Sequence, residues 1–204
     1  MTGLSLILRA QFKVSSVQKS LRNSVLGRAD GDKATSLGKP RAMTNDKYLH
    51  IYLADHHAGS VAGIELARRC ASSNKNNDIG QFLVATLMPA IEEDRATLGR
   101  IMKRVGASGN RLKDAMFWTG EKLGRLKPNG ELTAYSPLSR LIELEGLTSG
   151  VAGKLALWQS LRELRDPRLE PIDLTDLIAR AEEQLKGLEV QRRNAAVMAL
   201  RSEA

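Results

Sequence analysis

The stretch Asp78–Val105, DIGQFLVATLMPAIEEDRATLGRIMKRV, predicts a long amphipathic helix. Its large apolar residues recur every three or four positions, which is the spacing of one helical face. Asp78 is expected to cap this helix, and Pro89 predicts a kink or a break in its middle. Asp94 falls within the apolar stripe, so the helix directs one carboxylate toward a core. The other members of the stripe are Leu83, Leu87, Ile91, Leu98, Ile101 and Val105.

Similar periodicity predicts three more long helices, at about 46–72, 136–164 and 173–201. Ser136 followed by Pro137 is a strong helix start, a capping side chain before a proline at the first helical position. A shorter helix is expected at about 110–126. The chain is 42% hydrophobic but only 4% aromatic, which favours helices packed on helices. The predicted fold is therefore all-α: an antiparallel up-and-down bundle of four long helices plus one short helix.

The net charge of +8 is concentrated in a leader, residues 1–42, ahead of a single helical-bundle domain at 43–204. The leader contains eight Lys and Arg residues against two acidic residues. The remaining 23 basic and 21 acidic residues nearly cancel. A bundle with so little excess charge has no strong electrostatic attraction for nucleic acid, so we expect no nucleic-acid binding by this domain.

The leader has three competing interpretations. It is rich in Ser and Arg and has no acidic residue before Asp30, as in an organellar transit peptide or a membrane-surface helix. It is also consistent with a disordered tail, or with translated sequence upstream of a natural start at Met43. We favour a dispensable leader and a cytoplasmic protein. No run of eighteen apolar residues occurs, so no transmembrane segment is predicted. The single Cys70 excludes an intrachain disulfide and is interpreted as a packing residue.

The chain has three histidines, His50, His56 and His57. All of them lie in one eight-residue segment, 50–57, of the first predicted helix. Helical geometry places His56 near the centre of that helix's apolar stripe, and it places Glu145 among apolar residues of the helix at 136–164. With Asp94, three helices would each direct one ionisable side chain inward. Such groups need partners, which can be one another, hydroxyls, water or a metal. The predicted metal set is His56, Asp94 and Glu145, completed by His57 or Asp55, and these residue types suit Fe, Mn or Zn.

A bundle with inward carboxylates and histidine resembles the ferritin-like superfamily, whose di-metal members use two Glu-x-x-His motifs. This chain contains no Glu-x-x-His, so the resemblance does not bring a standard di-iron site. More specifically, residues 43–201 resemble a group of uncharacterised bacterial helix-bundle proteins, a likeness that implies no activity. The segments that carry it are Leu53–Gly59 (LADHHAG), Ala62–Arg69 (AGIELARR), Glu93–Arg95 (EDR), Tyr135–Arg140 (YSPLSR) and Gly153–Trp158 (GKLALW).

Two classes of function remain open from the sequence. The favoured one is a non-catalytic bundle that acts by self-association or by binding a protein partner, with the inward polar trio serving packing specificity. The alternative is a metal-binding or small-ligand-binding protein, with a possible redox role, that uses the His/Asp/Glu site. The usual nucleotide-binding, serine-hydrolase and Cys-x-x-Cys motifs do not occur.

Overall fold

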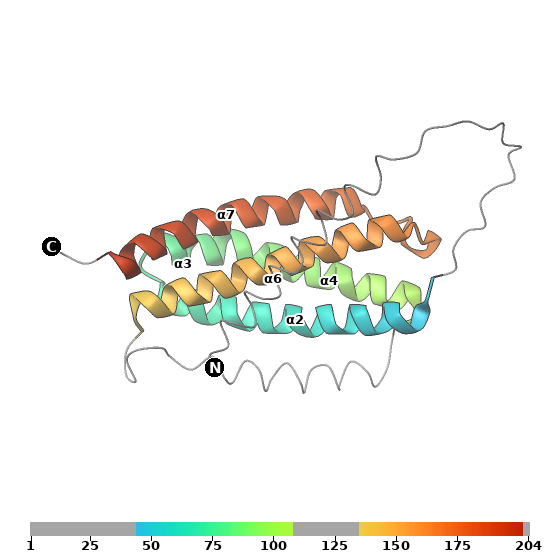
Figure 1. The fold of residues 1–204 in the computed structure, drawn as a ribbon, viewed down its shortest axis with the longest axis horizontal. Coiled ribbons are helices and arrows are strands. Elements are labelled where there is room, and N and C mark those ends of the chain that lie inside the picture. Colours follow the sequence, from blue (N-terminus) through green and yellow to red (C-terminus); the bar gives the residue numbers. More distant parts are fainter. Residues whose placement is uncertain (1–43, 108–134, 202–204) are drawn as a thin grey trace, which may run out of the picture. The chain divides into compact units, whose positions relative to one another are not determined.

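The computed structural model describes residues 44–107 and 135–201. The predictions for the leader at 1–42 and for the short helix at 110–126 lie outside these ranges. Within them, all regular structure is helical (Figure 1). The elements are α2 (Asp46–Ser73), α3 (Asp78–Phe82), the π-helical turn η1 (Leu83–Leu87), α4 (Met88–Val105), α6 (Pro137–Leu164), the 3₁₀ turn η2 (Pro167–Leu169) and α7 (Leu174–Leu200). The four predicted long helices are confirmed, with ends within a residue or two. None of the helices described here combines the length and hydropathy needed to cross a membrane.

Short polar side chains begin the helices, as the sequence suggested. The Asn45 side chain accepts from the backbone N–H of Tyr48, and the Ser136 side chain accepts from that of Ser139. The prediction for Asp78 was wrong by one residue. Asn77 is the cap, and its side chain accepts from the backbone N–H groups of the second and third residues after it. Asn and Asp are almost equal as caps, so sequence alone does not separate them.

Pro89 does not break the second helix. Instead, the five residues Leu83–Leu87 form a π-helical turn, in which the N–H of Met88 bonds to the carbonyl of Leu83. Proline lacks an N–H, and its ring clashes with the carbonyl four residues earlier. The extra residue in the π turn resets the hydrogen-bond ladder ahead of the proline. The whole segment from 78 to 105 therefore stays helical.

The four helices form a bundle in which each is antiparallel to its neighbours (Figure 1). The simple up-and-down order that we predicted is wrong, because α4 and α6 run in the same direction. α4 ends beside the start of α2, where Val105 accepts a hydrogen bond from His50. α6 begins beside the end of α2, where Tyr135 and Arg140 both bond to Asn74. Ala107 and Tyr135 therefore lie at opposite ends of the bundle, an arrangement that helix periodicity does not reveal.

The hydrophobic core is divided along the bundle axis into two clusters. One contains Leu53, Ile101 and Trp158, and the other contains Leu83, Leu144 and Leu188. Between them lies a layer in which the core position of α4 is Asp94, that of α6 is Lys154 and that of α7 is Gln184. This polar layer is the part of the interior that packing alone does not explain.

Candidate functional site

Asp94 is the centre of the polar layer, and only 1% of its surface is exposed. Its carboxylate accepts from Lys154 Nζ of α6 at 2.5 Å and from Arg180 of α7 at 2.5 Å. The Gln184 amide donates to the same carboxylate at 3.0 Å. Lys154 also donates to the side-chain oxygen of Gln184. Both carboxylate oxygens are therefore occupied, as a buried charge requires.

Sequence reasoning found Asp94 but missed its partners. Lys154 is the only basic residue of α6 between Arg140 and Arg162, and it stands among apolar residues. A lone lysine in such a helix was a usable signal, because burying an ammonium requires an anion nearby. Gln184 follows Leu177 and Ala181 on the apolar stripe of α7, which is a second such signal.

Burial lowers the pKa of Lys154, and the adjacent Asp94 carboxylate opposes that shift. Arg180 is less enclosed, and it also pairs with Glu93 at 2.8 Å on the surface. The cluster thus runs from the bundle centre to solvent along α4 and α7. Lys154 is its inner cation.

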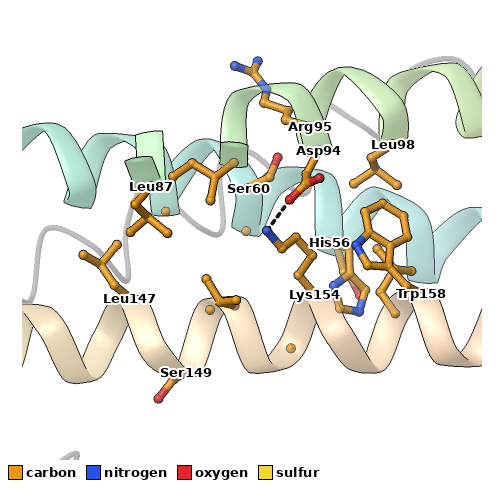
Figure 2. A pocket seen from close by; sticks show the side chains of 18 residues that line it. His56, Ser60, Leu87, Asp94, Arg95, Leu98, Leu147, Ser149, Lys154 and Trp158 are labelled. Carbon is orange, nitrogen blue, oxygen red and sulfur yellow. Dashed lines mark hydrogen bonds and ion pairs between the residues drawn. The ribbon is translucent and has the colours of Figure 1, made fainter. Parts of the chain in front are cut away.

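A cavity of about 320 Å³ adjoins Lys154 and lies between α2, α4 and α6 (Figure 2). From the end of η1 along α4 it extends from Leu87 to Leu98, eleven residues, which corresponds to about 16 Å of helix. Its apolar walls are Leu87, Ile91, Leu98, Leu147, Val151 and Leu157. The cavity is therefore elongated along the bundle axis, with an apolar part near Leu87 and Leu147 and a polar part near Lys154.

Four glycines form the border of this cavity where α2 faces α6. They are Gly59 and Gly63 of α2, and Gly150 and Gly153 of α6. A Cβ built on any of them meets no atom within 4 Å. Gly59 and Gly63, one turn apart on α2, therefore do not mark a close approach of a neighbouring helix; together with Gly150 and Gly153 they border open space.

The two adjacent histidines have different surroundings. His56 is half-buried, lines the cavity and packs edge-on against Tyr52, with ring centroids 4.6 Å apart. His57 does not line the cavity, and its buried Nδ1 has no hydrogen-bond partner in the described part of the chain. Burial lowers the pKa of both rings, and Arg95 lowers that of His57 further. Both imidazoles are therefore neutral at pH 7.

Trp158 carries the other buried polar atom without a partner among the described residues, its indole Nε1. The side chain is 1% exposed and lines the cavity. Figure 2 shows its nitrogen on the side of the ring that faces His56 and Lys154. An indole N–H can only donate a hydrogen bond, so any group that bonds to it must be an acceptor.

The predicted metal set does not come together. Glu145 is exposed rather than inward, because the core face of α6 is formed by Leu141, Leu144, Leu147 and Val151. This helix is apolar nearly all round, so its periodicity did not identify the buried face. Asp55 is exposed, although it lines the cavity. Across residues 44–107 and 135–201, no three His, Cys, Asp or Glu side chains are grouped closely enough to hold a metal ion.

A second polar cluster lies where α2 ends and α6 begins. The Asn74 amide donates to the Cys70 carbonyl and to the Tyr135 hydroxyl, each at 2.8 Å, and accepts from Arg140 at 2.6 Å. Tyr135 in turn donates to Glu143 at 2.9 Å. Burial raises the pKa of the Cys70 thiol to about 12, so the thiol is protonated and unreactive at neutral pH.

No protein-family model matches this chain, and comparison with curated proteins and with solved structures found no match. What the chain does must therefore be argued from its own residues.

Proposed function

We propose that this bundle binds a small, elongated and mainly apolar organic molecule in the cavity between α2, α4 and α6. The observation that carries the proposal is the cavity itself, about 320 Å³ in volume and beside a buried ion pair. Ligand sites in proteins are typically apolar hollows of this size with a few convergent polar groups.

The arrangement of residues supports a ligand site over a packing defect. The hollow is partly open to solvent, since Asp55, Gly59 and Gly150 on its border are exposed, and well-formed apolar hollows of this kind are few in one protein. Here the space is bordered by glycines on two facing helices, at positions where a Cβ would meet no other atom within 4 Å. Glycine within a helix also costs about 1 kcal/mol relative to alanine. The sequence thus carries helix-weakening residues at the positions that keep the cavity open.

The test is to fill the cavity border without weakening the helices. Gly63→Leu and Gly150→Leu each place an isobutyl group beside the cavity. Gly99→Leu on α4 is the matched control, since a Cβ there also meets nothing within 4 Å and Gly99 does not line the cavity. All three changes raise helix propensity.

Binding of 1-octanol and octanoate to the full chain is followed by ligand-observed NMR. We expect binding by the wild type and by Gly99→Leu, and at least a tenfold loss in the two cavity variants. Equal binding by all four proteins, or no binding by the wild type at millimolar probe, contradicts the proposal.

Self-association is a second candidate, favoured by the last turns of α7. Val190, Val197, Met198 and Leu200 there expose between 51% and 70% of their surface. Exposed apolar residues gathered on one element favour a protein contact. Sedimentation velocity of wild type and of Val197→Glu/Leu200→Glu tests this. A dimer that dissociates in the variant supports the contact, and a monomeric wild type excludes it.

A further inference from the structure

We propose that the ligand of this cavity is a medium-chain monocarboxylic acid, whose carboxylate accepts hydrogen bonds from Trp158 Nε1 and Lys154 Nζ. This inference rests on the proposed function and specifies its ligand. The starting point is the juxtaposition, on the same wall, of an ammonium and a buried indole N–H that has no partner within residues 44–107 and 135–201.

The two donors belong to one helical face. Trp158 follows Lys154 by four residues on α6, and side chains at that spacing are neighbours on a helix surface. Both residues line the cavity, in its polar part (Figure 2). One ligand group with two acceptor atoms is therefore suited to bind both.

The balance of donors and acceptors favours an acceptor ligand. Lys154 has three N–H groups, and among the described residues two of them are used, by Asp94 and by Gln184. The Asp94 oxygens are already occupied by Lys154, Arg180 and Gln184. The third ammonium N–H and the indole N–H thus remain for the ligand, while Asp94 has little capacity left for a ligand donor.

The charge around the inner part of the cluster favours an anion over a neutral acceptor. The buried carboxylate of Asp94 is shared by two cations, Lys154 and Arg180. The further carboxylates that pair with Arg180 are 62% and 57% exposed, so solvent screens them. Asp55, the other carboxylate that lines the cavity, is also exposed. Hydrogen bonds to an ionised acceptor are roughly twice as strong as neutral ones.

The apolar part of the cavity specifies the remainder of the molecule. From Lys154 the walls continue over Val151 and Leu147 on α6. On the opposite side they continue over Ile91 of α4 and Leu87 of η1. Seven residues separate Lys154 from Leu147, about 10 Å of helix. A linear chain of roughly eight carbons has a comparable length, at about 1.3 Å per bond, so octanoate is a suitable probe.

The first experiment compares three probes that share one chain and differ in the head group: octanoate, 1-octanol and octylamine. Isothermal titration calorimetry on the full chain at pH 7.5 measures their affinities. We expect octanoate to bind at least tenfold more tightly than octanol, because only the carboxylate combines charge with two acceptors. We expect octylamine to bind most weakly, since its head group is a cation beside Lys154.

Trp158→Phe keeps an aromatic ring and removes the donor, and it should weaken octanoate binding about tenfold with little effect on octanol. Tyr48→Phe likewise removes a donor from an aromatic side chain, but Tyr48 is exposed and does not line the cavity, so this control should leave both affinities unchanged. The wild-type protein gives an independent readout in ¹H–¹⁵N NMR spectra. Octanoate should move the Trp158 indole N–H resonance downfield, and octanol should not.

The outcomes separate the two proposals. If octanol and octanoate bind equally and the Trp158 indole resonance does not move, the carboxylate assignment is wrong while binding in the cavity stands. If none of the three probes binds at millimolar concentration, the proposed cavity binding and the carboxylate assignment are both wrong. If Trp158→Phe does not fold, the head-group series and the indole shift still decide the question.

Discussion

The two buried polar clusters of this bundle differ in whether they leave hydrogen-bond donors available to a ligand. At the end where α2 meets α6, Asn74 uses both amide hydrogens and its carbonyl oxygen within the protein. In the middle, Asp94 is equally satisfied, but its neighbour Lys154 and the nearby Trp158 border an open cavity. Buried polar groups that satisfy one another stabilise a fold, whereas donors that face a cavity are available for binding. The presence of a buried charge alone does not distinguish these cases.

The largest effect on stability is expected from a substitution that breaks the central cluster. Asp94→Asn removes the charge that Lys154 and Arg180 share, and we expect the free energy of unfolding to fall by about 3 kcal/mol or more in urea denaturation. Glu93→Gln is the matched control, because Glu93 pairs with the same Arg180 but is 62% exposed. It should cost less than about 1 kcal/mol. Similar losses for both variants would show that burial of Asp94 does not set its importance.

A smaller effect on stability is expected from substitutions in the end cluster, and these test whether that cluster is independent of the cavity. Asn74→Ala leaves Tyr135 and Arg140 without their amide partner, and we expect a loss of about 2 kcal/mol in stability. Tyr135→Phe, which removes only the hydroxyl, should cost about 1 kcal/mol. In both variants octanoate affinity should equal that of the wild type. A change in affinity would show that the two clusters are coupled and that our separation of them is wrong.

The smallest expected effect is the pH dependence of the unfolding free energy that His56 and His57 contribute. Burial lowers the pKa of His56 and His57 below 6.5, so the unfolded chain binds more protons than the folded chain just below that value. Stability contributed by the neutral rings is therefore fully present above pH 6.5 and is lost as the pH falls through that value toward the lowered pKa. In the end cluster, the raised pKa of Cys70 and of Tyr135 keeps both groups protonated over this range.

We expect the unfolding free energy to be lower at pH 5.5 than at pH 7.5, and the difference to shrink in His56→Gln/His57→Gln. Urea titrations at the two pH values measure it. The hydrogen bond from Arg168 lowers the pKa of Asp166 to about 2, so the stability that this carboxylate contributes is lost only below about pH 4. Asp166 therefore does not contribute to the difference between pH 5.5 and pH 7.5. An unchanged pH dependence in the double variant would exclude the histidines as its source.

Sequence reasoning was most accurate for the helices and least accurate for the site. The helix ends and the position of Asp94 followed from local signals, which depend on neighbours within a few residues. Glu145 was placed inward because α6 offers several apolar faces, and only its packing against α2 and α7 selects one. The Asp94–Lys154 pair joins residues sixty positions apart on non-neighbouring helices, so local patterns can indicate that each residue is buried but not that the two are paired.

The sequence by itself determined the all-helical composition, the extent of each long helix and the presence of a carboxylate on a core face, because hydrophobic periodicity and capping act locally. Only the tertiary structure decided that α4 and α6 run parallel, that Lys154 and Arg180 neutralise Asp94, and that four glycines border a cavity. The physical reason is that partners and empty space depend on how separate helices are placed relative to one another. Several placements are compatible with the same set of amphipathic helices.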